Sequence, residues 1–277
     1  MRLVHTVADL RATLAGERET AFVPTMGNLH SGHLSLVELA RRQGRPTVAS
    51  IFVNPLQFGD GEDFSRYPRT LQADCELLEQ AGCDLVFAPD AAAMYPEPQI
   101  YSVTPPLADE LCGAFRPGHF AGVCTVVLKL FNQVQPRYAA FGKKDWQQLF
   151  LLKGMVRQLD LPIVVIEGET ARAPDGLALS SRNGYLTEAE RVEAPRLHAC
   201  LASMADRLRA GESGLAGLEA EAARLLSGHG WRVDYVAIRS RSTLLAPHPK
   251  DRELVALAAA HLGTTRLIDN LEVTLPG

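Results

Sequence analysis

Two histidines lie where an apolar segment gives way to a helical pattern. Residues 22–42 read FVPTMGNLHSGHLSLVELARR, with His30 and His33 at the junction and Gly27 and Gly32 beside them. At a spacing of three residues both imidazoles can face one side of the helix start. Free backbone N–H groups and the helix dipole favour an anion there. Two imidazole donors beside free amides suit a triphosphate whose charge shifts during a reaction. Gly27 permits a tight turn, and Gly32 permits a ligand to approach the backbone closely.

Two other interpretations of the histidine pair stay open. A zinc site needs about three or four protein ligands, and no neighbouring cluster of cysteine or histidine supplies them. The pair could also simply pack within the fold. The motif H-x-G-H is short, so phosphate binding is a hypothesis that needs support from the rest of the chain.

The segments around this junction alternate between strand-like and helical patterns. Apolar strand-like runs lie at residues 21–26, 47–53, 84–89, 138–142 and 162–168. Helical patterns lie at residues 32–43, 69–82, 118–134 and 145–159. This alternation predicts a parallel sheet with helices on both faces. Because crossovers are right-handed, a doubly wound sheet is expected, and ligands bind beyond the carboxyl ends of its strands.

The composition changes after about residue 170. Residues 187–211 and 215–230 are helical segments rich in Ala, Leu and Glu, and strand candidates follow at 232–240, 253–262 and 264–274. Helices followed by strands predict a small α+β domain. The expected fold is therefore α/β, a doubly wound parallel sheet over residues 1–168 with a smaller α+β C-terminal domain over residues 169–277.

Composition and charge exclude several functional classes. The net charge of −4 argues against a general nucleic-acid binder, and no apolar stretch approaches the roughly 20 residues that span a bilayer. The first residues carry acids early and lack the apolar core of a signal peptide. The five cysteines are odd in number and lack C-x-x-C spacing, so reduced, buried thiols in a cytoplasm are expected.

Six segments, in one order, carry a family resemblance. PTMGNLHSGH, NPLQF, RYPRTLQADCELL, FRPGHFAGVCTVVLKLFN, FGKKDWQQL and DGLALSSRNGYL closely resemble the pantothenate synthetases, also called pantoate–beta-alanine ligases. The resemblance implies condensation of (R)-pantoate with beta-alanine through a pantoyl adenylate, giving pantothenate, AMP and pyrophosphate. This is a step of pantothenate (vitamin B5) and coenzyme A biosynthesis. It also implies Mg²⁺ carried with ATP and not by a fixed protein site, a homodimer, and a Rossmann-like domain with a small C-terminal lid.

The resemblance also assigns roles to residues of this sequence. The implied catalytic residues are His33, His30, Lys144 and Arg182. The implied ATP-binding residues are Met26, Gly27, Asn28, Leu29, His30, Ser31, Gly32, His33, Gly142, Lys143, Lys144, Asp145, Ala171, Leu179, Ser180, Ser181 and Arg182. Lys143 departs from the family pattern, which more often has Glu at that position. Pantoate is expected at Gln57 and Gln148, and beta-alanine at Gln57.

Several neighbouring residues have a structural interpretation beside the functional one. Met26 and Phe58 could line the pocket for the dimethyl group of pantoate or belong to an ordinary core. Gln147 is expected to be structural. Arg116 and His119 are expected near the rim of the site, and the charged segment 62–70 as a solvated loop.

Two rival functions remain. An H-x-G-H nucleotidyltransferase would keep the nucleotide in its product, whereas a ligase releases free AMP. A nucleotide-binding regulator would bind ATP without catalysis, and the presence of His33, Lys144 and Arg182 argues against it.

Overall fold

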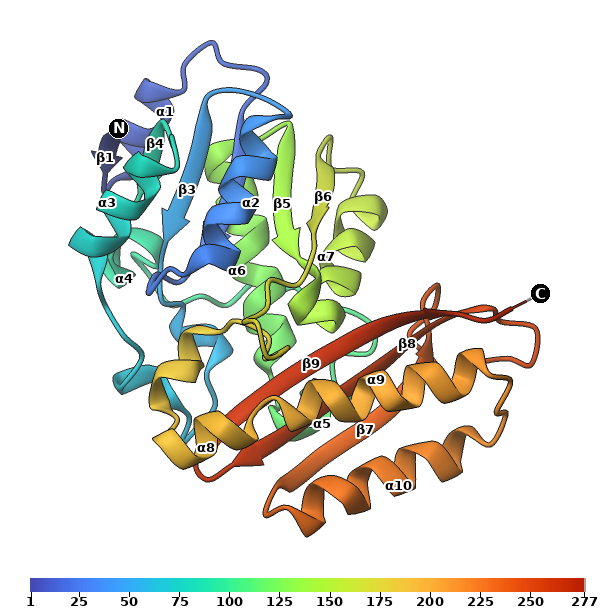
Figure 1. Cartoon of the computed structure of the whole chain (residues 1–277). Helices are drawn as coiled ribbons and strands as arrows, with labels where there is room; N and C mark the ends of the chain where they lie inside the picture. The colour runs from blue at the N-terminus through green and yellow to red at the C-terminus, as the bar shows by residue number, and fades with distance from the viewer. Residues whose placement is uncertain (277) are drawn as a thin grey trace. The chain divides into compact units, whose positions relative to one another are not determined.

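A computed structural model describes residues 1–276, which form two compact units (Figure 1). The first unit comprises Met1–Lys143 and Gln148–Glu169. The second comprises Lys144–Gln147 and the described chain from Thr170 onward. The four residues Lys144–Gln147 thus pack with the second unit although the flanking chain packs with the first.

The first unit is built on a six-stranded parallel sheet. Its spatial order is β1-β4-β3-β2-β5-β6, and all its strand pairs are parallel. The strands are β1 (Arg2–Val4), β2 (Ala21–Thr25), β3 (Thr47–Ile51), β4 (Leu85–Phe87), β5 (Tyr138–Gly142) and β6 (Val164–Gly168). The predicted parallel sheet is confirmed. β1 has no counterpart among the predicted strands, because it has three residues and buries only Val4.

Helices cover both faces of this sheet, as the alternating pattern predicts (Figure 1). The connections β2–α2–β3 and β3–α3–β4 run toward one edge of the sheet, and β5–α7–β6 runs toward the other. Right-handed crossovers therefore place α2 and α3 on one face and α7 on the opposite face. On the first face, α2 packs into a fully buried cluster with β2 and β3. On the other, Phe131 of α6 packs edge-on against Phe22 and Phe141.

The longer helices of the first unit are α1 (Val7–Thr13), α2 (Ser31–Arg41), α3 (Leu71–Gln80), α6 (His119–Val134) and α7 (Trp146–Gln158). Short helical turns lie at α4 (Ala91–Met94), α5 (Cys112–Phe115), η1 (Pro55–Gln57), η2 (Asp63–Ser65) and η3 (Lys143–Asp145). The first helix and the short turns were not predicted, because each is too brief to show a helical period.

The order of the strands identifies where a ligand is expected. β2 and β5 are neighbours, and the chain leaves them toward opposite edges of the sheet. The carboxyl ends of two such strands form a topological switch point, the usual ligand site of an open α/β sheet. Met26 follows β2 directly, and Lys143 follows β5. The loop that leads from β2 to His30 and His33 therefore begins at this switch point.

The second unit is a three-stranded antiparallel sheet covered by two helices. The strands β7 (Arg232–Ser240), β8 (Glu253–Leu262) and β9 (Thr265–Thr274) lie in sequence order. α9 (Arg196–Arg209) and α10 (Leu215–Gly228) bury their leucines against the alanines of β8. This confirms the predicted α+β fold.

The single helical segment expected at 187–211 is wrong in one respect. It consists of α8 (Glu188–Glu193) and α9, separated at Ala194 and Pro195. Proline has no N–H to donate to the preceding turn, so α8 ends and a new helix begins.

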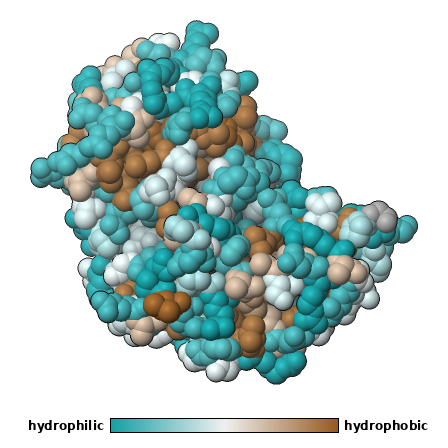
Figure 2. Space-filling view, viewed as in Figure 1, coloured by the Kyte–Doolittle hydropathy of each residue, from teal (hydrophilic) through white to brown (hydrophobic). Residues whose placement is uncertain are grey.

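The surface combines polar and apolar side chains in both units (Figure 2). The exposed large apolar side chains include Leu3, Leu71, Val164 and the adjacent Ile100 and Tyr101 in the first unit, and Val192 and Leu225 in the second. Exposed apolar side chains are common on globular proteins. Among the described residues, no helix is long and apolar enough to cross a membrane.

Candidate active site

The loop after β2 is shaped by a buried carboxylate. Gly27 (φ 82°) and Asn28 (φ 50°) both adopt the left-handed conformation, so the tight turn expected at Gly27 is confirmed. Asp74 of α3, 1% exposed, accepts hydrogen bonds from the amides of Asn28 (2.9 Å) and Leu29 (2.8 Å) and from the Thr70 hydroxyl (3.0 Å). A Cβ at Gly27 would lie 2.9 Å from this carboxylate. Asp74 was missed from the sequence, because an acid in the first turn of a helix normally indicates only a dipole contact.

His30 and His33 cap the start of α2 reciprocally. The Gly32 amide donates to His30 Nδ1 (3.1 Å), and the His30 amide donates to His33 Nδ1 (3.3 Å). The rings lie 4.1 Å apart between centroids, so both face one side of the helix start, as expected. The expectation of free amides is wrong for Gly32, because a nearby imidazole nitrogen accepts its hydrogen.

The cap determines which nitrogen of each ring carries the proton. A ring nitrogen that accepts from an N–H cannot itself hold a hydrogen, so in neutral rings both protons lie on Nε2. His30 and His33 therefore each provide an Nε2–H donor. The cap itself depends on the rings, so removing either imidazole also leaves a backbone amide without its acceptor.

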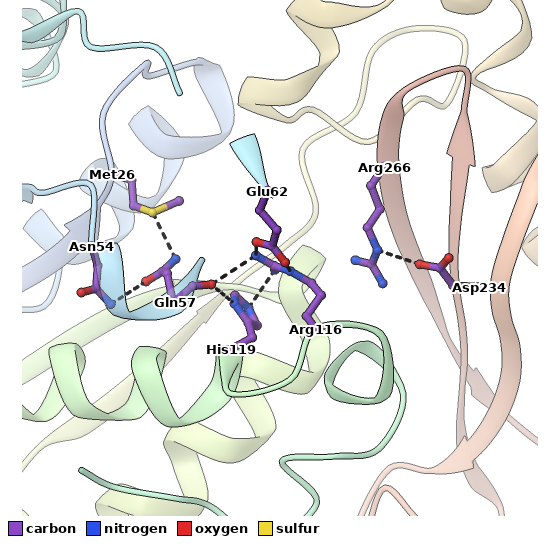
Figure 3. Close-up of polar contacts among 8 residues, drawn as sticks. All are labelled: Met26, Asn54, Gln57, Glu62, Arg116, His119, Asp234 and Arg266. Atoms are coloured by element: carbon purple, nitrogen blue, oxygen red, sulfur yellow. Dashed lines mark hydrogen bonds and ion pairs between the residues drawn. The ribbon is translucent and has the colours of Figure 1, made fainter. Parts of the chain in front are cut away.

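Gln57 is held in a buried network on the same unit (Figure 3). Asn54 Nδ2 donates to Gln57 Oε1 (3.1 Å) and to the Gly122 carbonyl (3.1 Å). Gln57 Nε2 donates to Met26 Sδ (3.1 Å). α6 approaches η1 so closely that a Cβ on Gly122 would lie 2.1 Å from the carbonyl oxygen of Leu56. The Gln57 oxygen thus already accepts one hydrogen bond, and its NH₂ group has a second hydrogen for a ligand.

Asn54 is a second residue that sequence reasoning missed. Its Oδ1 accepts from the Leu56 amide (3.3 Å), which caps η1, and from the Tyr95 hydroxyl (2.8 Å). Burial raises the pKa of Tyr95 well above its ordinary value, so the phenol stays protonated and donates. An Asn before a Pro is a turn signal, and this was the available indication.

Arg116 and His119 both contact the backbone carbonyl of Gln57. His119 Nδ1 lies 2.8 Å from the Gln57 carbonyl oxygen, and Arg116 Nη2 lies 3.4 Å from it. Arg116 Nη1 donates to His119 Nε2 (3.0 Å), so the His119 proton lies on Nδ1. Arg116 is also paired with Glu62 at 2.8 and 2.6 Å. The expectation of a solvated loop is wrong for Glu62, which this partner partly buries.

Phe58 lies in an aromatic cluster. Its ring centroid is 5.3 Å from that of Phe64 and 6.0 Å from that of Tyr67. Aromatic pairs at these separations stabilise packing beyond the area that they bury.

The segment after β5 separates two adjacent lysines. Lys143 Nζ pairs with Glu169 Oε1 (2.6 Å) within the first unit. Lys144 belongs to the second unit, where its ammonium lies 3.7 Å from Asp145 Oδ2 and its carbonyl accepts from Asn270 Nδ2 (2.8 Å). The two lysines therefore have different environments.

The two glutamines at the start of α7 also differ. Gln147 is 4% exposed, in agreement with its structural interpretation, whereas Gln148 is half-buried. Gln147 belongs to the second unit and Gln148 to the first.

Local hydrogen bonds hold the segment of the second unit that is predicted to bind ATP, residues 179–182. The Leu179 amide donates to the Ala171 carbonyl (2.9 Å), and Ser180 Oγ accepts from the Arg182 amide (3.2 Å). Ser181–Tyr185 form a short 3₁₀ helix, η4, capped by Ser180. These residues therefore form a hydrogen-bonded turn, in which the Ser180 hydroxyl accepts from the Arg182 amide as a helix cap does.

A buried ion pair lies beside this segment. Arg172 donates to both carboxylate oxygens of Asp269 at 2.7 and 2.9 Å, and His198 Nδ1 lies 3.3 Å from Oδ2. The Asp269 side chain is 3% exposed. Burial alone would raise the pKa of Asp269, but His198 and Arg172 outweigh it and hold that pKa below its ordinary value.

We expect Asp269→Asn to destabilise the second unit by about 3–5 kcal/mol at pH 7, because it leaves the buried Arg172 charge without its partner. The folded pKa of Asp269 is depressed, so its stabilisation is present above the unfolded pKa and is lost as the pH falls through the folded pKa. Urea unfolding should therefore show a difference in the free energy of unfolding between wild type and Asp269→Asn that becomes smaller at acid pH. The exposed pair of Asp175 and Arg191 provides the control, since Asp175→Asn should change stability little. Equal effects of the two substitutions would contradict this account.

The structure distributes the predicted site residues between the two units. The first unit holds Met26, Gly27, Asn28, Leu29, His30, Ser31, Gly32, His33, Gln57, Gly142, Lys143 and Gln148. The second holds Lys144, Asp145, Ala171, Leu179, Ser180, Ser181 and Arg182. Within residues 1–276, no three His, Cys, Asp or Glu side chains are grouped as a metal site would require. The five cysteines are free thiols, and all except Cys75 are buried.

Comparison with known proteins identifies the family. Residues 2–272 match the model of the family described as pantoate-beta-alanine ligase. A pantothenate synthetase of Thiobacillus denitrificans is 62% identical over 276 residues, covering 99% of this chain and 98% of that protein. The crystal structure of pantothenate synthetase from Thermus thermophilus matches with a TM-score of 0.94 and 48% identity, covering all of both chains.

A third similar protein was crystallised with ligands. Pantoate-beta-alanine ligase from Francisella tularensis, complexed with beta-gamma ATP and beta-alanine, has a TM-score of 0.82 and 31% identity, covering 98% of this chain and 97% of its own. With the α/β sheet, the capped histidine pair and these matches together, the chain belongs to the pantoate–beta-alanine ligase family.

Proposed function

We propose that this enzyme condenses (R)-pantoate with beta-alanine in two steps that use ATP. The pantoate carboxylate attacks the α-phosphate of ATP, forming pantoyl adenylate and releasing pyrophosphate. The amine of beta-alanine then attacks the acyl carbon and releases AMP. The contact between Gln57 and Met26 carries the proposal, because it links the amide proposed for pantoate to the loop proposed for ATP.

The histidine pair suits the first step. Both Nε2–H groups are donors whose orientation the helix cap fixes before substrate arrives. Donors fixed in this way stabilise negative charge that develops on phosphate oxygens without reorganising. Lys144 and Arg182 would add positive charge to the same polyphosphate, and the Ser180 and Ser181 hydroxyls would add neutral donors. Gly142, Leu179 and the backbone near Ala171 are among the other proposed ATP contacts.

Pantoate is proposed to bind at Gln57 and Gln148. Gln57 Oε1 already accepts from Asn54 and Nε2 already donates to Met26, so the second Nε2 hydrogen is the donor proposed for the carboxylate or a hydroxyl of pantoate. The same amide is proposed to contact beta-alanine. The structure of the protein from Francisella tularensis is a complex with beta-gamma ATP and beta-alanine, which supports ATP and beta-alanine as substrates here.

Other parts of the proposal concern magnesium, assembly and location. Mg²⁺ would accompany ATP and offset phosphate charge, and the half-exposed Asp145 carboxylate is an oxygen donor of the kind that this ion prefers.

We propose residues 1–168 as the ATP- and pantoate-binding domain, residues 169–277 as a lid, and a homodimer as the assembly. Five free cysteines suit the reducing cytoplasm.

Pyrophosphate exchange tests the proposed sequence of steps. Pantoate-dependent exchange of labelled pyrophosphate into ATP should proceed without beta-alanine, because the adenylate forms before the amine reacts. Omitting pantoate should abolish the exchange. If exchange strictly required beta-alanine, the reaction would be concerted and the adenylate step would be withdrawn.

A further inference from the structure

The dipeptide Asp269–Asn270 on β9 has no part in the proposed chemistry, yet both residues are buried and hydrogen-bonded. Asn270 is 5% exposed, and its side-chain Nδ2 donates to the carbonyl of Lys144 at 2.8 Å. Its own amide donates to Asp269 Oδ1 (2.8 Å), and its carbonyl accepts from Arg172 Nη2 (3.3 Å). A single strand position is thus bonded to two segments distant in the sequence.

Both of those segments carry proposed ATP residues. Arg172, held by Asp269, donates to the Gly176 carbonyl (3.1 Å) and forms a β-bridge with Ala178. That bridge leads directly into residues 179–182. Lys144, Ser180 and Asp269 also line the same small cavity of the second unit. The dipeptide therefore connects the Lys144 segment to the 171–182 segment.

The position of the Lys144 ammonium depends on its main chain. The 3.7 Å between its Nζ and Asp145 is longer than a hydrogen bond, and a lysine stem has four rotatable bonds. The direction in which the stem leaves the backbone therefore limits where the charge can lie. The Asn270 side chain fixes the peptide that sets this direction.

We propose that Asn270 is a positioning residue for Lys144. Asp269 and Asn270 together hold the Lys144 segment at a fixed position relative to the 171–182 segment. The inference rests on the proposed role of Lys144 in adenylation. On this proposal, β9 of the second unit helps to position the catalytic lysine. An Asn is suited to this position because an aspartate of the same shape has no hydrogen to donate to a carbonyl.

A double-mutant cycle distinguishes positioning from general stability. Asn270→Asp and Asn270→Ala are each made in wild type and in Lys144→Ala, and pantoate-dependent adenylation is measured in single turnover with the full chain. In wild type we expect a decrease of about 10- to 100-fold, the usual cost of a misplaced catalytic group. In Lys144→Ala the same substitutions should change the rate by less than about twofold, because the group they position is already absent.

Asp234→Asn serves as a matched control. Asp234 is a buried carboxylate of β7 that accepts from Arg266 Nε at 2.8 Å (Figure 3), so its substitution breaks an ion pair in the same sheet without contacting Lys144. It should lower the urea midpoint and leave adenylation per folded molecule unchanged.

Three results would overturn the inference. The first is an adenylation rate that neither Asn270 substitution changes in wild type. The second is a decrease that is equally large in wild type and in Lys144→Ala. The third is a decrease for Asp234→Asn as large as that for the Asn270 variants. Failure of the proposed function appears separately, as wild-type protein that forms no pantoyl adenylate. If Lys144→Ala kept wild-type activity while wild type formed the adenylate, the role of Lys144 and this inference would fall together, and the ligase function would stand.

Discussion

Replacing His33 with alanine is expected to slow adenylate formation by about 10²–10³-fold, the usual effect of removing one preorganised donor to a developing oxyanion. The donor is His33 Nε2–H, because His33 Nδ1 accepts the His30 amide. The loss should fall on the rate of the chemical step and not on the fold, since the ring is only half-buried. Single-turnover formation of pantoyl adenylate from ATP and pantoate measures this rate directly.

The reciprocal cap requires a control for this experiment. Alanine at His33 removes both the Nε2–H donor and the acceptor of the His30 amide. Glutamine occupies this position in many helix caps and can accept that amide. His33→Gln should therefore recover any stability that alanine loses, and should remain slow because the imidazole is absent. Near-normal turnover of a folded His33→Ala enzyme would show that this ring does not act on the phosphates.

The second large effect is expected at Lys144. Lys144→Ala should lower adenylation by about 10²–10³-fold, because a positive charge near the transferring phosphate is removed. Lys143→Ala is the matched control, one residue earlier in the same turn. Its ammonium is committed to Glu169 at 2.6 Å within the first unit, so its loss should leave most activity.

Lys143→Glu tests the same assignment more severely. The family resemblance leads us to expect Glu at this position, but here it would face Glu169, which is 81% exposed and can turn into solvent. We expect most activity to remain. The steady-state rate at saturating ATP and pantoate should be compared for the three variants. Equal losses at Lys143 and Lys144 would show that the catalytic lysine has been assigned to the wrong position.

Local sequence pattern predicted the elements well where a period was long enough to repeat. β7 and β8 begin and end at the predicted residues, because β-branched and apolar residues fill them and turn residues flank them. α2 begins at Ser31, one residue before the predicted start, since the cap lies in the side chain of His30. Pro195 was visible in the sequence, yet the Ala- and Glu-rich pattern on both sides concealed the break that it makes.

The supporting residues of the site were harder to predict for a physical reason. His30, His33 and Gln57 stand in short motifs, and their chemistry is visible in their types and spacing. Asp74 lies more than 40 residues from the amides that it binds, and Asn270 lies 126 residues from Lys144. Contacts of this kind depend on the tertiary fold and leave no periodic signal in one sequence. The same limit applies to Lys144–Gln147, which pack with the second unit although their neighbours do not.

The ligase function is tested most directly by supplying ATP, pantoate and beta-alanine together and following every product. We predict AMP, pyrophosphate and pantothenate in equal amounts, with no nucleotide attached to the final product and no AMP formed when pantoate is omitted. A product that retains the nucleotide would instead identify an H-x-G-H nucleotidyltransferase. ATP binding without turnover, in protein that is folded and supplied with Mg²⁺, would contradict the catalytic account altogether.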